Sequence, residues 1–297
     1  MKRLNVGKRL VSLGLILSLG LAAGCSASDA TTAQAGTNSE TKAEATDASS
    51  DETKEAVTLK VGASVTPHAE LLNQVKADLE AKGIKLEVIE IEDVVTPNTG
   101  VADGSLDANF FQHVPFLDSF NSENGTDLVS VGATHYEPFG LYKGKSDDLK
   151  NIKEGAIIGV PNNATNEARA LLLLQQEGII KLKDGADINT TTEDIVENSK
   201  NVEIKEIAPE QLVTSLPDLD FAIINGNYAL EGGLKVKDAL AVEAADGLAA
   251  QTYKNVVVVK SEKKDDPAIK ELVNALQSDK ITDYINNTYD GAVVPVK

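Results

Sequence analysis

From residue 57 onward, the chain alternates short segments that have the pattern of β-strands with longer segments that have the pattern of α-helices. Strands are expected at residues 57–63, 85–91, 107–111, 128–133, 156–160, 202–207, 221–225 and 256–259. Helices are expected to begin at 67, after 97, near 114, at 163 and at 209, and a helix at 266–277 is expected to close the chain. This order predicts an α/β fold with largely parallel sheets and helices on both faces.

The strand and helix pattern occurs in two sets, which predicts two α/β lobes. Residues 57–297 are enough for two domains of ordinary size. We expect lobe I to contain residues 57–140 and 253–297, and lobe II to contain residues 141–252. Ligands of open α/β sheets bind beyond the carboxyl ends of the strands, so a ligand cleft is expected between the lobes.

The segment before residue 57 has the composition of an export signal followed by a linker. Residues 1–24 begin with basic side chains and continue with an apolar run that is too short to span a membrane, which is typical of a signal peptide. Residues 26–56 contain no Leu, Ile, Val or aromatic residue. Such a composition cannot bury enough apolar surface to fold. Residues 25–56 are therefore predicted to form a lipidated, disordered tether.

Cys25 is the only cysteine of the chain, and it directly follows the predicted signal. The run Leu21-Ala22-Ala23-Gly24-Cys25 resembles the lipobox of bacterial lipoproteins, which predicts acyl chains (palmitate) on Cys25. The alternative is an ordinary signal peptide with an incidental thiol. Because no second cysteine exists, disulfides within the chain, thiolate metal sites and cysteine nucleophiles are excluded.

The net charge limits the partners that the protein can have. The whole chain carries −18, and removal of residues 1–24 takes away four basic residues and no acidic one, which gives −22. Nucleic acids and anionic lipid headgroups bind to positive surfaces. Binding of either through the general field of the protein is therefore excluded.

Arg169 is the only arginine outside the predicted signal peptide, where all other basic residues are lysines. A planar fork of donors is suited to two-point recognition of a carboxylate. The residue lies near the start of an expected helix, on the same face as Asn166, where free N–H groups favour an anion. The alternative is a surface arginine paired with Glu167 or Asp194.

Seven of the 12 aromatic residues fall between residues 110 and 142. Phe110 and Phe120 are expected to pack in a core. Phe111, His113 and Phe116 follow a predicted strand and could form an apolar wall with one polar group. Asn225 ends another predicted strand and could bind an ammonium or a carboxylate group, or it could simply be a turn residue of Asn225-Gly226-Asn227.

Four runs carry a resemblance to a known family: residues 103–121 (DGSLDANFFQHVPFLDSFN), 129–142 (VSVGATHYEPFGLY), 159–175 (GVPNNATNEARALLLLQ) and 222–229 (AIINGNYA). They resemble the NlpA lipoprotein family, the methionine-binding lipoproteins of ABC importers. The resemblance implies a two-lobed periplasmic-binding-protein fold that captures methionine for a permease and its ATPase. It also implies that Phe111, His113 and Phe116 line the side-chain pocket, while Asn166, Arg169 and Asn225 hold the amino and carboxyl groups.

Two residues depart from the family pattern. Val94 and Phe116 stand where tyrosine is frequent, so two hydroxyl groups are missing from the expected pocket. An apolar pocket separates ligands that differ by one methylene by only about 1–3 kcal/mol. We therefore expect L-methionine or another apolar amino acid of similar size to bind, with weak discrimination among close analogues.

The sequence thus predicts a substrate-binding lipoprotein, anchored by lipid to the extracytoplasmic face of the cell membrane, without a cofactor or a metal. Two alternatives remain at this point. An enzyme could use the imidazoles of His68, His113 and His135 beside carboxylates, although no HExxH or Ser-His-Asp signature is present. A surface adhesin would need the same anchor and tether. Turnover of a ligand would favour the enzyme, and stoichiometric binding without turnover would favour the carrier.

Overall fold

The computed structural model describes residues 57–243 and 248–296. All of them belong to one compact unit, Glu52–Lys297. The predicted signal peptide, the lipidation site Cys25 and the predicted tether 26–56 lie outside the described residues. Within the described ranges, none of the helices has the length and apolar character that a membrane span requires.

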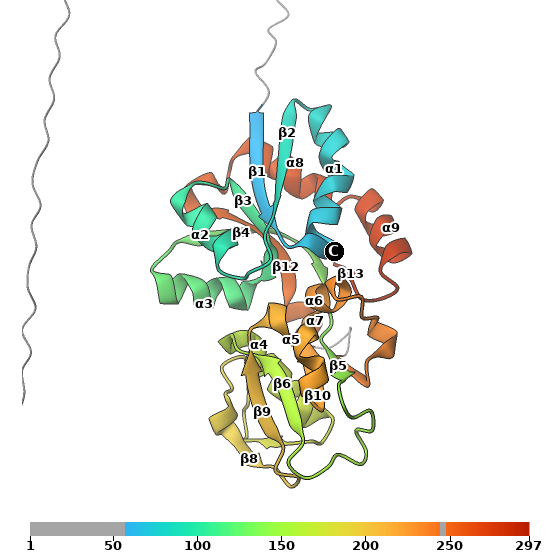
Figure 1. The fold of residues 1–297 in the computed structure, drawn as a ribbon. Helices are drawn as coiled ribbons and strands as arrows, with labels where there is room; N and C mark the ends of the chain where they lie inside the picture. The colour runs from blue at the N-terminus through green and yellow to red at the C-terminus, as the bar shows by residue number, and fades with distance from the viewer. Residues whose placement is uncertain (1–56, 244–247, 297) are drawn as a thin grey trace, which may run out of the picture. The chain divides into compact units, whose positions relative to one another are not determined.

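Two mixed sheets form the framework of this unit (Figure 1). The six-stranded sheet has the order β13-β4-β12-β3-β1-β2, and the five-stranded sheet has the order β11-β5-β10-β6-β9. The strands of the first are β1 (Val57–Ala63), β2 (Ile84–Glu90), β3 (Ala108–His113), β4 (Leu128–Tyr136), β12 (Lys254–Lys260) and β13 (Val294–Pro295). Those of the second are β5 (Gly140–Lys143), β6 (Ile157–Pro161), β9 (Glu203–Ile207), β10 (Phe221–Ile224) and β11 (Ala241–Val242). A separate ribbon pairs β7 (Lys181–Leu182) with β8 (Ile195–Glu197).

Helices connect the strands. They are α1 (Glu70–Glu80), α2 (Thr96–Asp103), α3 (Val114–Asn124), α4 (Ala164–Gln176), α5 (Leu212–Ser215), α6 (Gly226–Glu231), α7 (Leu248–Thr252), α8 (Pro267–Leu276) and α9 (Asp279–Thr288). Their ends follow local rules: the Asp266 carboxylate accepts from the first free N–H groups of α8, and Gly125 takes the left-handed conformation (φ 65°) that ends α3. Short helical turns occur at Val65–Ala69, Thr192–Asp194, Pro209–Gln211, Leu216–Asp218, Val236–Asp238 and Ser261–Lys263.

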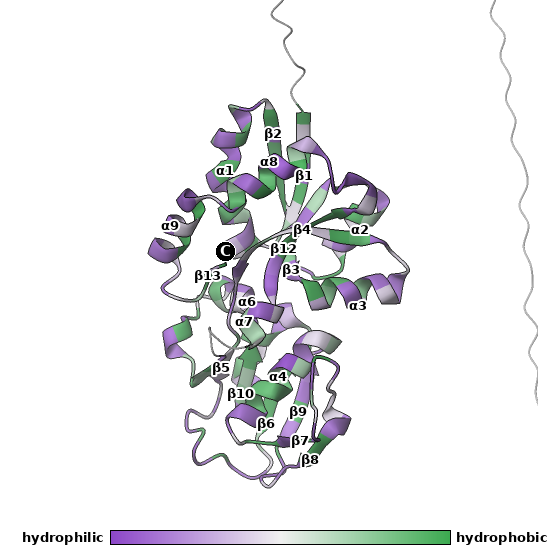
Figure 2. Ribbon diagram, turned by 180° about the vertical axis from the view of Figure 1, so that it is seen from behind, coloured by the Kyte–Doolittle hydropathy of each residue, from purple (hydrophilic) through white to green (hydrophobic). Residues whose placement is uncertain are grey.

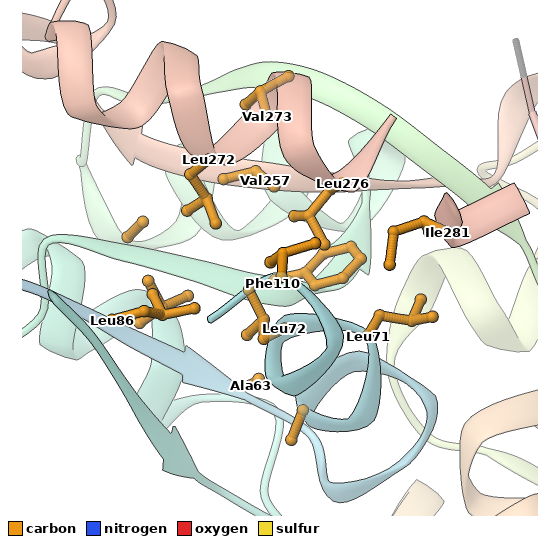
Figure 3. Close-up of a cluster of buried hydrophobic side chains, with 14 of the residues drawn as sticks. Ala63, Leu71, Leu72, Leu86, Phe110, Val257, Leu272, Val273, Leu276 and Ile281 are labelled. Carbon is orange, nitrogen blue, oxygen red and sulfur yellow. The ribbon is translucent and has the colours of Figure 1, made fainter. Parts of the chain in front are cut away.

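The core of the first lobe, which is built on the six-stranded sheet, combines the two ends of the described chain. In Figure 3, Leu71 and Leu72 of α1 lie near Phe110 of β3 and Leu276 of α8, and all four are buried. Burial of each such side chain contributes about 1.5–3 kcal/mol relative to exposure. This packing places the C-terminal helices on the same lobe as β1, as the blue and red segments of Figure 1 show.

The second lobe, which is built on the five-stranded sheet, is packed around α4. Leu171 and Leu174 of α4 are fully buried against Ile158 of β6 and Phe221 of β10. Figure 2 shows the same separation by hydropathy, with largely green strands such as β10 and purple outer faces on helices such as α9. Phe110 and Phe120 are core residues, as the sequence predicts.

The predicted α/β fold with two lobes is confirmed, but the prediction of largely parallel sheets is right for only part of each sheet. Strands β2-β1-β3 and β9-β6-β10 are parallel. Strand β12 runs antiparallel to both β3 and β4, and β5 runs antiparallel to β10 and β11. After β4 the chain crosses to the second sheet, and it returns to the first sheet as β12. Because β12 enters the first sheet at the edge where β4 leaves it, the two neighbouring strands run in opposite directions.

Two further expectations about chain organisation have different outcomes. The helix expected to close the chain does not do so, because α9 and β13 follow α8. Strand β13 pairs with β4 and so belongs to the first sheet. It has only two residues, which is too short for a hydrophobic pattern to predict a strand. The lobe limits 57–140, 253–297 and 141–252 stay a prediction.

The mixed topology determines which residues meet at one edge of the six-stranded sheet. Because β12 is antiparallel to its neighbours, its amino end lies beside the carboxyl ends of β3 and β4. Asn255 is therefore opposite His113 on one side and His135 on the other. Polar residues from three strands are brought together at this edge.

Candidate ligand-binding site

A cavity lies between residues of the two sheets, with about 460 Å³ of space outside the atoms, including the part that opens to solvent. All six residues predicted from the sequence line it. The lining consists of Val94, Phe111, Gln112, His113, Phe116, Glu137, Phe139, Asn166, Arg169, Asn225, Gly226, Asn227, Tyr228 and Asn255.

His113 connects the two lobes at this cavity. It ends β3, and its ring Nδ1 accepts the Phe116 N–H at the start of α3, at 3.2 Å. This bond assigns the proton to Nε2, which lies 2.9 Å from Asn166 Oδ1 on α4 and donates to it. Burial, and then the charge of Arg169, lower the pKa of His113 to about 4, so the ring is neutral at pH 7. Because Asn166 Oδ1 accepts from His113, the N–H donors of the Asn166 amide are the groups that this side chain can present to a ligand.

The apolar side of the cavity is aromatic and aliphatic. Phe111 and Phe116 pack edge to face with their ring centres 5.9 Å apart, and Val94 contributes from the segment before α2. A thioether or an alkyl chain packs well against such ring edges. None of these three side chains carries a hydroxyl, so this wall offers shape and dispersion rather than hydrogen bonds.

Arg169 is buried rather than on the surface, with 3% of its area exposed, and its partner is neither Glu167 nor Asp194. Its Nε donates to both oxygens of the Glu243 carboxylate, at 2.8 and 2.9 Å, and its Nη2 donates to Glu243 Oε2 as well. Nη2 also donates to the main-chain carbonyl of Glu137, at 2.8 Å. The two-point carboxylate contact expected of this arginine is thus made within the protein, and these partners engage Nε and Nη2 rather than Nη1.

Aromatic rings enclose this ion pair. The guanidinium carbon of Arg169 lies 3.8 Å from the ring centre of Phe139 and 4.5 Å from that of Tyr253. The faces of aromatic rings attract a cation, so both rings stabilise the charge of Arg169. Tyr136 donates from its hydroxyl to Glu243 Oε2, at 2.6 Å. Burial alone would raise the pKa of Glu243, but the Arg169 charge and these hydrogen bonds hold the pKa below its usual value. Glu243 is therefore a carboxylate at pH 7, and the pair is neutral as a whole.

Asn225 follows β10 and precedes α6, at the carboxyl end of the strand, as the sequence predicts. Its side-chain Oδ1 is buried and has no hydrogen-bond partner. An unpaired buried acceptor costs free energy, about 1–3 kcal/mol, unless a donor reaches it. The neighbouring Gly226 must be small, because a Cβ there would lie 2.7 Å from the Cβ of Glu137.

A buried amide network supports the aromatic wall from behind. Asn98 and Gln112 exchange two side-chain hydrogen bonds, and Asn109 donates to Asn98 Oδ1 and to the carbonyl of Pro97, at 2.8 and 3.1 Å. All three amides are buried. The network fixes the start of α2 against β3, and with it the position of Val94.

In the described part of the chain, one cluster has side chains that could ligate a metal ion: His68, His135 and Glu137, whose ligand atoms lie within 4.8 Å of one another. Each of these atoms already has a hydrogen-bond partner. His135 Nε2 lies 2.7 Å from Glu137 Oε1, and His68 Nε2 lies 3.0 Å from Asn255 Oδ1. These contacts make the cluster a hydrogen-bonded network that borders the cavity.

Sequence reasoning missed Glu137 and Asn255, which line the cavity, and Glu243, which pairs with Arg169. Asn255 precedes an apolar strand, and only the antiparallel direction of β12 brings it to the edge where other strands end. Glu243 is an acidic residue after a short apolar run, ALAV, which is a weak signal. The sequence stretch HYEP attracts attention to Glu137 only as a possible acid or base.

Comparisons with known proteins show the family to which this chain is related. Residues 59–297 match the family model described as NlpA lipoprotein. A methionine-binding lipoprotein MetQ of Bacillus subtilis is 39% identical over 242 residues, which cover 80% of this chain and 87% of that protein. The crystal structure of a lipoprotein from Ruminococcus gnavus is 53% identical with a TM-score of 0.80, and the match covers 82% of this chain and all of that one.

A further solved structure holds a ligand. It is a nutrient-binding protein from Burkholderia cenocepacia bound to methionine, 41% identical, with a TM-score of 0.75 over 80% of this chain and all of that one. The family model covers most of the sequence, and the relatives are matched over nearly their whole length. This chain therefore belongs to the NlpA lipoprotein family.

Proposed function

We propose that this protein is the substrate-binding lipoprotein of an ABC transporter and captures L-methionine or an apolar amino acid of similar size. The observation that carries the proposal is the cavity itself, which joins an apolar aromatic wall to a set of polar groups between two lobes. An amino acid has the same division, with two charged groups at one end and a side chain at the other. The methionine-bound relative from Burkholderia cenocepacia supports the choice of ligand.

In this proposal, different lining residues contact different parts of the ligand. The side chain lies against Phe111, Phe116 and Val94. The ligand carboxylate accepts from the Asn166 amide and from Nη1 of Arg169, the guanidinium nitrogen that neither Glu243 nor the Glu137 carbonyl engages. The ligand amino group donates to Asn225 Oδ1, which otherwise lacks a partner. His113 orients Asn166 in this arrangement and remains neutral.

The protein acts as a carrier and not as an enzyme in this proposal. His113, the imidazole at the cavity, uses both ring nitrogens to hold Phe116 and Asn166 in place, which leaves no lone pair for proton transfer. A lipid on Cys25 attaches the protein to the extracytoplasmic face of the cell membrane, and a permease with its ATPase receives the ligand. The first prediction of this function concerns binding alone.

A thermal-shift and calorimetry panel of the common amino acids and methionine-containing dipeptides, on the full chain, tests the proposal. We expect L-methionine to raise the melting temperature most, with Leu and Ile giving smaller shifts and Asp, Glu and Lys giving none. Charged side chains are rejected because burying an ion without a partner is costly. Binding of only a charged amino acid, or of no member of the panel, would refute the proposal. Binding of only a dipeptide would keep the carrier role and change the substrate.

A further inference from the structure

The apolar wall of the ligand cavity is also a wall of a second cavity. The second cavity has about 1030 Å³ of space outside the atoms, including the part that opens to solvent, and it lies against α3 and the start of α4. Val94 and Phe116 line both cavities. These two side chains therefore form a partition between the place of the ligand side chain and a larger free space.

The two sides of this partition are held in different ways. Phe116 belongs to α3, its N–H donates to His113 Nδ1, and its ring packs edge to face on Phe111. Val94 lies in the irregular segment 91–95, which connects β2 to α2. The position of Val94 therefore depends on the contacts that its neighbours in this segment make.

Tyr228 of α6 holds the segment from the second lobe. Its hydroxyl donates to the main-chain carbonyl of Glu92, at 2.9 Å. Tyr228 is buried, and burial raises the pKa of its hydroxyl, which stays protonated and can donate at pH 7. Val94 itself packs against the apolar cluster of the second lobe to which Tyr228 belongs. One hydrogen bond and one apolar contact thus dock the segment on the second lobe, although β2 belongs to the first sheet.

Asp93 holds the segment from the side of α2. One oxygen of its carboxylate accepts the N–H groups of Val95 and Thr96, at 2.8 and 2.7 Å. Burial alone would raise the pKa of Asp93, but these hydrogen bonds hold the pKa below its usual value, so the group is a carboxylate at pH 7. Val94 is therefore fixed on both sides, by Tyr228 before it and by Asp93 at the start of α2.

The position of Val94 limits the length of the ligand side chain. If the segment moved away from Phe116, the ligand cavity would join the second cavity, and a side chain longer than that of methionine could extend past Val94. With the segment held in place, the same side chain must displace a packed wall, which costs free energy. The length that the cavity accepts therefore depends on the residues that hold Val94 as well as on Val94 itself.

We propose that Tyr228 determines specificity: through the Glu92 carbonyl it holds Val94 beside Phe116 and so sets the longest side chain that the cavity accepts. Asp93 has the same effect from the side of α2. Both are positioning residues, because they act through Val94. This inference rests on the proposed function and adds that a contact between α6 and segment 91–95 controls selection by side-chain length.

Calorimetry with Tyr228→Phe tests the inference. The variant keeps the ring and removes only the hydroxyl. L-Methionine is compared with L-ethionine, whose side chain is longer by one methylene. In the parent, methionine should bind about tenfold more tightly, at the low end of what an apolar pocket gives for one methylene. In Tyr228→Phe this preference should fall to threefold or less. A merely structural role would weaken the binding of both ligands equally and leave the ratio unchanged.

A second variant and a matched control complete the experiment. Asp93→Ala removes a partly exposed side chain, so the variant is expected to fold, and it should also lower the preference to threefold or less. Tyr284→Phe removes a tyrosine hydroxyl on α9, which contacts Tyr289 on the first lobe. This control should keep the tenfold preference of the parent.

The outcomes separate this inference from the proposed function. If the parent protein binds no amino acid, the proposed function fails, and the inference fails with it. If the parent binds methionine but binds ethionine within threefold, only the inference is overturned. A folded Tyr228→Phe variant that retains the tenfold preference overturns it as well. Should that variant not fold, Asp93→Ala decides: loss of the preference supports the inference, and retention overturns it.

Discussion

At the scale of single residues, one buried ion pair, Arg169 with Glu243, adjoins the cavity. Arg169 stands out because all other basic residues outside the predicted signal peptide are lysines, and the structure buries it at the cavity. Its partner Glu243 lies 74 positions away, and nothing in the local sequence of either residue indicates the other. Contacts of this kind depend on the whole fold, so a pattern read along the chain cannot supply them.

Replacing Arg169 by lysine tests the role of the guanidinium fork. Lysine keeps the charge but cannot make the two-point contact with Glu243 and donate to the Glu137 carbonyl at the same time. We expect methionine affinity to fall at least about thirtyfold, equivalent to about 2 kcal/mol, together with a lower melting temperature. Calorimetry measures the first and thermal unfolding the second, with the exposed exchange Lys76→Arg as control. An affinity within twofold of the parent in a folded variant would contradict the role.

At the scale of elements, strand and helix positions follow from hydrophobic periodicity, whereas strand direction does not. The expected strand at residues 57–63 coincides with β1, and the helix expected to begin at 163 is α4, which begins at Ala164. Direction depends on where the chain crosses between sheets, which periodicity does not encode. Asn255 lies at the amino end of an antiparallel strand, so the rule that ligands bind at the carboxyl ends of strands does not point to it.

The packing of α8 on the first lobe leads to a stability prediction. Leu272 is fully buried in the core that α1, β3 and α8 share. Leu272→Ala should lower the free energy of unfolding by about 2–5 kcal/mol, because it removes buried methyl groups and leaves a cavity. The neighbouring Lys270→Ala, on the exposed side of the same helix, should cost much less. Urea unfolding of both variants measures the difference, and equal midpoints would contradict the prediction.

At the scale of the whole molecule, the two-lobed architecture and the family follow from sequence, while the anchor awaits experiment. Four short runs are enough to indicate the family, because each combines several residues that later meet at the cavity. The charge state of the site could not be predicted in the same way. The charge state depends on the carboxyl groups of Glu137 and Glu243 and on the guanidinium group of Arg169. All three are buried, and their burial is known only from the fold.

The predicted anchor can be tested by changing Cys25. Cys25→Ser removes the thiol that would carry the acyl chains, and we expect the protein to move from the membrane fraction to the soluble fraction of fractionated cells. Mass spectrometry of the parent protein should show the mass of the lipid. A Ser variant that stays in the membrane fraction would contradict lipid anchoring at this residue.

The position of Arg169 also has a mechanical consequence. Arg169 belongs to the second lobe, and it holds the Glu137 carbonyl, where the chain leaves β4, and the Glu243 carboxylate, just after β11. Its guanidinium also lies against Tyr253, directly before the return through β12. This one side chain therefore links the segment that leaves the first lobe after β4 with the segment that returns to it before β12. The ion pair with Glu243 lies within the second lobe, whereas the hydrogen bond to the Glu137 carbonyl reaches the segment that follows β4, so the contact of Arg169 between the lobes is made by that hydrogen bond and not by the ion pair.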